Sequence, residues 1–162
     1  MKPFLSRTTY LLLGLLALCA GPLHAQREKL PLEDLEYVEK KWPDAKRTYT
    51  GLRYVVLKKP AKDTPDAMPV PGMIVKVLYK GMLLNGKVFD EDLDPSQPLR
   101  TRLGRGELID GWEEALQKMH RGEKWLLIVP PEMAYGATGK PPLIPRQATL
   151  LFEMELLDFE KK

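Results

Sequence analysis

Residues 73 to 90 read MIVKVLYKGMLLNGKVFD and contain the pattern that decides the fold. Apolar and polar side chains alternate in the first half, with Val75 and Tyr79 on one face and lysines on the other. A period of two is typical of a strand that buries one face. Asn85 and Gly86 follow and form a two-residue hairpin signal. The stretch therefore predicts two antiparallel strands, with Tyr79 pointing inward.

The stretch IDGWEEALQKMHRG, residues 109 to 122, predicts one amphipathic helix. Asp110 and Glu113 stand in the relation of a capping box, and Gly122 is a typical helix terminator. The residues that share one face of such a helix are apolar, namely Trp112, Ala115, Leu116 and Met119. We expect this face to pack on a sheet.

Three further stretches predict strands: TGLRYVVLKK at 50–59, EKWLLIVP at 123–130 and ATLLFEMELLDF at 148–159. In the last of these, Phe152 alternates with acidic residues and should therefore also face inward. Several strands, one central helix and no strand–helix–strand alternation predict an α+β domain with an antiparallel sheet folded over the helix. Tyr79, Trp112 and Phe152 would then be near neighbours.

The first 25 residues have the layout of a secretory signal peptide. Lys2 and Arg7 precede a leucine-rich run that is too short to span a membrane, and small residues lead to Ala25, where we expect cleavage. An uncleaved membrane anchor is the less favoured alternative. The only cysteine, Cys19, lies in this segment, so the mature chain would form no disulfide.

After the signal peptide, residues 26–50 predict a short helical extension that stops at Pro43, and residues 51–162 form the main domain. The apolar residues near helical spacing in the extension are Leu32, Leu35, Tyr37 and Val38. This extension is too short for dimerisation through a long helix, so we expect a monomer. Removing the signal peptide lowers the formal charge from +3 to +1, because that segment holds two basic and no acidic residues. The charge gives no reason to expect a nucleic-acid partner.

The residue inventory argues against nucleophilic, metal and cofactor chemistry. Beyond the signal peptide, the chain has one serine, Ser96, and one histidine, His120, too few for a Ser–His or Cys–His pair or a zinc site. The stretch DEDLDPS at 90–96 resembles the start of an EF-hand loop. However, Pro95 stands where that loop needs glycine and Thr101 where it needs glutamate, so a solvated acidic turn is the plainer interpretation.

Four motifs, in the order LYKGMLLNGKVFD, LGRGELIDGWEEALQKMHRGEK, VPPEMAYGATGKPPLIP and ATLLFEMELL, resemble the FKBP-type peptidyl-prolyl cis-trans isomerases, the tacrolimus-binding immunophilins. The likeness runs from about Val70 to Phe159, and with the signal peptide the chain resembles an exported bacterial member. The resemblance implies a half-open antiparallel β-sheet wrapped around one short amphipathic helix, with a shallow apolar pocket between them.

The resemblance also implies roles for individual residues. Trp112 would form the floor of the pocket, while the Ile109 N–H and the Tyr135 hydroxyl would donate to substrate carbonyls. The Asp90 carboxylate would be the fourth catalytic group, and the proline-rich loop would hold Tyr135 at the rim with Ile144 beside it. The substrate-binding walls would be Tyr79, Phe89, Leu99, Leu108, Ile144 and Phe152. Since Phe89 and Asp90 are neighbours, both can line one pocket only if their strand bulges.

Some residues depart from the family pattern. Leu99 and Thr101 replace usual aromatic residues, and Pro95 stands near the place of a basic partner for Asp90. We expect the lost aromatic wall to loosen binding of tacrolimus-type macrolides. Lys140 on the rim favours tolerance of acidic residues near the substrate proline.

We therefore predict a peptidyl-prolyl cis-trans isomerase that accelerates X-Pro rotation during folding of proteins exported to a bacterial periplasm. Its partners would be proline-containing polypeptides and macrolide ligands, with no metal and no cofactor. The alternative is a non-catalytic FKBP-like chaperone that grips peptide segments without accelerating rotation. An isomerisation assay separates the two.

Overall fold

The computed structural model describes residues 27–62 and 67–161. Seven strands form one antiparallel sheet in the order β1-β2-β6-β7-β3-β4, with β5 also paired to β3. The strands are β1 Lys46–Arg47, β2 Arg53–Lys58, β3 Ile74–Leu83, β4 Val88–Asp92, β5 Leu99–Arg102, β6 Lys124–Val129 and β7 Leu150–Glu160. The predicted signal peptide, with Cys19, lies outside the described residues.

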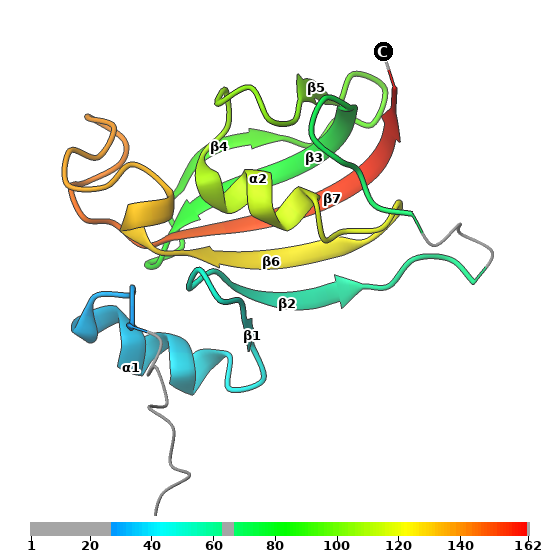
Figure 1. Ribbon diagram of the computed structural model, residues 1–162. Helices are drawn as coiled ribbons and strands as arrows, with labels where there is room; N and C mark the ends of the chain where they lie inside the picture. The colour runs from blue at the N-terminus through cyan, green and yellow to red at the C-terminus, as the bar shows by residue number, and fades with distance from the viewer. Residues whose placement is uncertain (1–26, 63–66, 162) are drawn as a thin grey trace, which may run out of the picture.

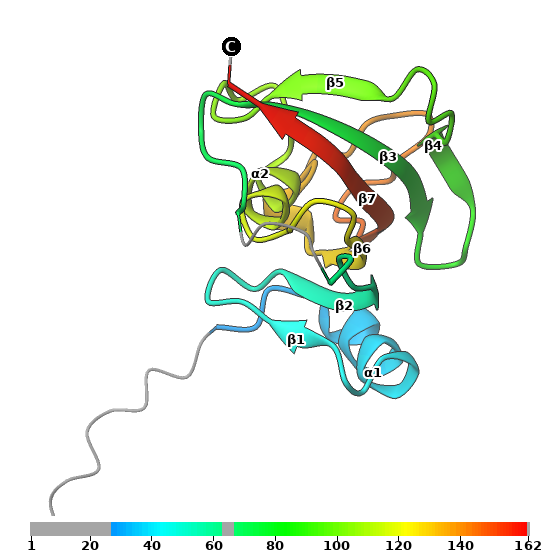
Figure 2. The same cartoon turned by 90° about the vertical axis from the view of Figure 1, so that its right-hand side faces the viewer.

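The sheet curves around helix α2, Asp110–Leu116, while helix α1, Leu32–Lys41, lies beside β1 and β2 at the lower end of the molecule (Figures 1 and 2). A single 3-10 turn, η1 at Pro131–Met133, opens the proline-rich loop. This arrangement confirms the predicted α+β fold with an antiparallel sheet wrapped around a short helix. Within residues 27–62 and 67–161, no helix combines the length and apolar character needed to cross a membrane.

The predicted apolar face of α2 packs into the main core. Trp112 is 6% exposed, and the other three members are fully buried, namely Ala115, Leu116 and Met119. Gly111 lets the helix approach β6 closely, because a Cβ atom there would lie 2.6 Å from Val129 Cγ1. The first turn of α2 is thus held against the sheet.

The start of α2 differs from the predicted capping box. Its N-cap is Ile109 in an extended conformation, with no side-chain capping hydrogen bond. The two carboxylate oxygens of Glu113 accept instead from the Gly104 N–H, at 3.0 and 2.9 Å. The prediction of a capping box between Asp110 and Glu113 is therefore wrong. Glu113 instead holds the loop that leads into the helix.

The end of α2 also differs from the prediction, because the helix stops at Leu116, well before Gly122. The Gln117 side chain donates to the Glu113 carbonyl at 2.8 Å, and the chain then turns. The Gly122 N–H donates to the carbonyl of Leu156 in β7 at 2.7 Å. The segment between the helix and β6 is thus tied to the sheet instead of continuing the helix.

The hairpin between β3 and β4 is present, but its turn is not the predicted two-residue type. The Gly86 N–H donates to the Leu83 carbonyl, and the Leu83 N–H donates to the Lys87 carbonyl, both at 2.9 Å. Gly86 has φ +85°. Leu84 and Asn85 therefore form a tight turn that a left-handed glycine completes, which is a three-residue hairpin loop.

Helix α1 and the segment before it cover the second face of the sheet. Val38 is fully buried, and with Leu30 it contacts residues of β6 and β7 that point away from α2, namely Leu126, Ile128 and Leu151. The continuous apolar run of β6 follows from this, because its successive side chains enter two different cores. Burying Val38 contributes roughly 1.5–3 kcal/mol.

Of the four apolar residues near helical spacing in the extension, only Leu35 and Val38 pack on the sheet. Leu32 is 83% exposed and Tyr37 is 42% exposed. Helical spacing alone could not distinguish the packed residues from the exposed ones, because the sequence does not show how the helix is oriented on its sheet.

Polar contacts tie the extension to the domain. Glu28 accepts from the Arg53 guanidinium at 2.7 Å, and Arg47 lies 3.2 Å from the same carboxylate oxygen. The Thr149 hydroxyl donates to Asp34 at 2.6 Å. Arg53 is only 7% exposed, and this pairing offsets the cost of burying its charge.

Protonation of Glu28 in acid should weaken the packing of the extension on the domain. Partial burial alone would raise the pKa of this carboxyl, but the Leu30 N–H and the Arg53 guanidinium outweigh burial and hold the pKa below its usual 4.5. The resulting stabilisation is complete above pH 4.5 and is lost as the pH falls through the folded-state pKa. We expect hydrogen exchange of the α1 amides, followed by mass spectrometry, to accelerate relative to the β3 amides in that range.

The matched control for this prediction is Glu33→Gln, which removes an exposed carboxylate from the same segment. Glu28→Gln should show fast α1 exchange already at neutral pH and little further change in acid. Equal acid sensitivity of wild type and Glu28→Gln would contradict the assignment.

Candidate active site

Aromatic side chains surround the first turn of α2. The Trp112 ring lies 4.8 Å from the Tyr79 ring and 5.2 Å from the Phe152 ring, centroid to centroid, and Phe89 lies 5.7 Å from Phe152. All three contacts are edge-to-face, the arrangement that ring quadrupoles favour. The predicted neighbourhood of Tyr79, Trp112 and Phe152 is therefore confirmed, and this aromatic cluster is the candidate site.

A bulge in β4 brings Phe89 and Asp90 to the same region. Gly81 pairs with Asp90 and Met82 pairs with Val88, so Phe89 is the extra residue. The sequence required such a bulge if both side chains were to line one site. The bulge lets Phe89 join the aromatic cluster while Asp90 faces the Tyr79 hydroxyl.

Gly81 is a site residue that sequence reasoning missed. A Cβ atom at this position would lie 2.7 Å from the Phe89 ring and 2.9 Å from the Phe152 ring. Only glycine lets both rings cross this part of β3. The available signal was a glycine inside an otherwise regular strand, which often marks a close approach.

Asp90 and Tyr79 form the polar edge of the cluster. The Tyr79 hydroxyl donates to Asp90 Oδ2 at 3.0 Å. Burial, followed by this hydrogen bond and the negative charge of Asp90, raises the pKa of Tyr79 to about 12. Tyr79 therefore keeps its proton and orients the Asp90 carboxylate.

The Tyr79 titration can be measured directly. Tyr79→Phe should remove the highest-pH step from the ultraviolet titration of tyrosinate. Asp90→Asn should move that step down from about 12 but not fully to 10, since burial remains. Because the folded-state pKa is raised, this stabilisation is complete below pH 10 and is lost as the pH rises through about 12.

A Tyr37→Phe variant is the control, because Tyr37 lies on α1, outside the aromatic cluster. This substitution should leave the highest-pH step unchanged. An unchanged titration curve for Asp90→Asn would contradict the proposed coupling between Asp90 and Tyr79.

The proline-rich loop holds Tyr135 beside the cluster through main-chain hydrogen bonds. The Gly136 N–H donates to the Pro131 carbonyl at 2.8 Å, and the Gly139 N–H donates to the Tyr135 carbonyl at 3.0 Å. The Lys140 ammonium lies 5.6 Å from the centre of the Tyr135 ring. The Tyr135 hydroxyl makes no hydrogen bond with the described residues, so it is a donor without an assigned acceptor.

Ile109 supplies a second unused donor. As the N-cap of α2 it lies next to the Trp112 turn, and its N–H donates to no described residue. The buried Trp112 Nε1–H also has no partner in the described part of the chain. Leu108 and Leu99 are partly buried and pack against the same core.

The predicted pocket residues differ in how much of their surface is exposed. Trp112, Phe152 and Ile144 are 6%, 3% and 2% exposed, so they are mostly covered. Ile144 is therefore buried rather than at the rim, and its main chain forms a bridge with Lys140. The half-buried members that can offer surface are Tyr79, Phe89, Leu99, Leu108, Ile109 and Tyr135. Two surface hollows, of about 710 and 720 Å³, lie outside the cluster.

The acidic stretch at 90–96 forms a local turn. Asp94 Oδ1 accepts from the Ser96 N–H at 2.8 Å and from its hydroxyl at 2.7 Å, and these bonds lower the pKa of Asp94. In residues 27–62 and 67–161, no group of three His, Cys, Asp or Glu side chains is placed to hold a metal ion.

Comparison with known proteins decides the family. Residues 66–157 match the family model of the FKBP-type peptidyl-prolyl cis-trans isomerases. The chain belongs to this family. The FKBP-type isomerase described here therefore accelerates rotation of X-Pro bonds, and its family binds proline-containing substrates and FK506-type ligands. The family match favours catalysis over the non-catalytic chaperone alternative.

Two relatives of the isomerase are fungal. It is 43% identical over 94 residues to FK506-binding protein 1A of Aspergillus fumigatus, covering 58% of this chain and 84% of the relative. It is 41% identical over 112 residues to FK506-binding protein 2 of Candida glabrata, covering 68% of this chain and 82% of the relative. The bacterial source inferred from the N-terminal segment stays a prediction.

Proposed function

We propose that this isomerase assists the folding of proteins exported to a bacterial periplasm and acts there as a monomer. We assign catalysis to Trp112, Ile109, Tyr135 and Asp90. We assign substrate binding to Tyr79, Phe89, Leu99, Leu108, Ile144 and Phe152. The observation that supports the assignment is the aromatic cluster around Trp112, with two unused donors beside it, Ile109 N–H and Tyr135 hydroxyl.

The mechanism follows from the chemistry of the X-Pro bond. Resonance gives its C–N bond partial double-bond character, with a barrier of about 20 kcal/mol. Twisting the bond removes the conjugation and reduces the charge separation of the amide. An apolar site from which water is excluded therefore stabilises the twisted amide more than the planar one. No covalent intermediate is needed.

The polar groups hold the peptide on either side of the rotating bond. The Ile109 N–H and the Tyr135 hydroxyl donate to substrate carbonyls, so that one side of the peptide stays fixed while the other turns. The Tyr79 hydroxyl orients the Asp90 carboxylate at 3.0 Å. Asp90 in turn faces the amide from the apolar wall.

The test is a protease-coupled isomerisation assay on the chain from Gln26, with short X-Pro peptides as substrates. Tyr135→Phe removes one hydrogen bond to substrate and should lower kcat/KM roughly three- to tenfold. Asp90→Ala should lower it by about tenfold, since it also leaves the Tyr79 hydroxyl without an acceptor.

Controls for these two variants are Tyr49→Phe and Asp44→Ala, which change the same residue types outside the cluster. Both should keep wild-type rates. If wild type, Asp90→Ala and Tyr135→Phe all turn over at one rate, neither side chain takes part in catalysis.

Export is tested separately from activity. The full chain is expressed in a Gram-negative bacterium, and the periplasmic and cytoplasmic fractions are analysed by N-terminal mass spectrometry. We expect a periplasmic form that begins at Gln26. A cytoplasmic form that keeps Met1, with full isomerase activity, would refute the export proposal and leave the catalytic proposal standing.

A further inference from the structure

The outer edge of β2 is open along four of its six residues. β1 pairs only with Arg53 and Tyr54, so the edge from Val55 to Lys58 has no strand partner among the described residues. An unpaired strand edge presents main-chain donors and acceptors that another strand can use. This open edge borders a hollow of about 710 Å³.

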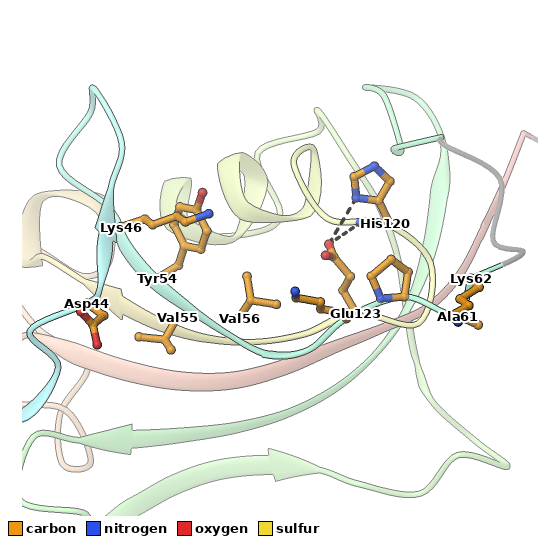
Figure 3. A pocket seen from close by; sticks show the side chains of 11 residues that line it. Asp44, Lys46, Tyr54, Val55, Val56, Ala61, Lys62, His120 and Glu123 are labelled. Carbon is orange, nitrogen blue, oxygen red and sulfur yellow. Dashed lines mark hydrogen bonds and ion pairs between the residues drawn. The ribbon is translucent and has the colours of Figure 1, made fainter.

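The floor of the hollow is apolar. Tyr54 stacks on Trp125 with ring centroids 4.2 Å apart and planes 10° apart, and Val56 packs beside it. Figure 3 shows Tyr54, Val55 and Val56 along the strand, with His120 beyond Val56 and above Glu123. Alternate side chains of an added strand would meet this floor.

The rim of the hollow is basic. It carries Lys46, Lys59 and Lys62, and none of the three forms an ion pair with a described residue. Figure 3 places Lys46 at one end of the strand edge and Lys62 at the other. Such a spread of cations suits an extended acidic ligand better than a compact one.

Among the described residues, two carboxylates also line the hollow. Glu123 is 7% exposed and accepts from the His120 N–H at 2.8 Å. Asp44 is exposed. Among the described lining residues, three lysines against two carboxylates leave an excess of positive charge.

We propose that an extended acidic peptide segment of a partner protein adds as a strand to the edge of β2 between Val55 and Lys58. Its main chain pairs with β2, and its carboxylates lie against Lys46, Lys59 and Lys62. The open edge favours a peptide over other anions, because only a polypeptide has main-chain groups at the spacing of a strand. This surface is distinct from the aromatic cluster and requires no proline.

The experiment uses a fluorescent, proline-free peptide of alternating glutamate and valine, with binding followed by anisotropy. Replacing Lys46, Lys59 and Lys62 together by glutamate should weaken binding at least about tenfold. The matched control replaces Lys40, Lys87 and Lys161 by glutamate, which makes the same change in net charge elsewhere, and should stay within about twofold of wild type. Both triple variants should keep wild-type isomerase rates on a short X-Pro peptide.

Main-chain pairing is tested with two N-methylated copies of the peptide, each methylated on one edge only. One copy should lose binding about tenfold, since one edge must pair with β2, while the other copy binds as before. Equal binding of all three peptides would overturn the strand addition. Equal competition by an oligonucleotide of the same charge would identify a general anion surface instead. If wild type sediments as a dimer and the Lys46, Lys59 and Lys62 triple variant sediments as a monomer, the occupant is a second copy of the chain.

Discussion

Replacing Trp112 by alanine should lower kcat/KM by roughly 10- to 100-fold and destabilise the fold by about 3–5 kcal/mol. The activity loss follows from removal of the apolar floor against which the substrate proline would lie. The stability loss follows from the position of the ring, which is 6% exposed between Tyr79 and Phe152. Isomerisation assays below the melting temperature, together with denaturant titrations, separate the two effects.

Trp125→Ala is the matched control for Trp112→Ala. Trp125 is 4% exposed and likewise has an Nε1–H without a partner in the described part of the chain, but it stacks on Tyr54, away from the aromatic cluster. Its loss should cost a similar amount of stability and change kcat/KM by less than about threefold. Equal losses of kcat/KM in the two variants would show that stability alone controls activity.

Gly139→Ala should be the most disruptive small change in the proline-rich loop. Gly139 has φ +68°, and a Cβ atom there would lie 2.4 Å from the Pro145 carbonyl oxygen and 2.5 Å from that of Ile144. Main-chain oxygens cannot move aside as a side chain can, so the loop must open. We expect a loss of about 2–4 kcal/mol in the free energy of unfolding. We also expect reduced turnover, because the Gly139 N–H holds the Tyr135 carbonyl.

Gly136→Ala provides the comparison within the same loop. Gly136 also has a left-handed φ, +53°, but nothing lies within 4 Å of an added Cβ atom. It should lose only about 1–2 kcal/mol, the cost of the backbone conformation itself. If both variants melt at the same temperature, the contact with Pro145 and Ile144 carries no extra cost.

The sequence predicted the centre of the candidate site well, because each member had a periodic context. Tyr79 and Phe152 each lie in a period-two pattern of inward-facing apolar residues on their strands, and Trp112 shares a helical face with other buried residues. Periodicity fixes the direction of a side chain, and direction decides which side chains meet across a core. The burial of Ile144 had no such signal, since its neighbours form an irregular loop.

Features that depend on contacts between distant segments were missed. β5 was not predicted, because its four residues, Leu99–Arg102, gain strand geometry only by pairing with β3. The early end of α2 is followed by a segment that the hydrogen bond from Gly122 to Leu156 ties to β7. The continuous apolar run of β6 signalled burial on both faces, but the sequence did not show that α1 supplies the second cover.

The seating of α1 against β6 and β7 also sets an order of assembly. Leu30 and Val38 leave the ribosome early, but the side chains that receive them, Leu126, Ile128 and Leu151, belong to the last part of the chain to be made. The apolar side chains of α1 therefore have no packing partners on the sheet until synthesis is nearly complete. Of the described residues, the extension is made first and meets its packing partners last.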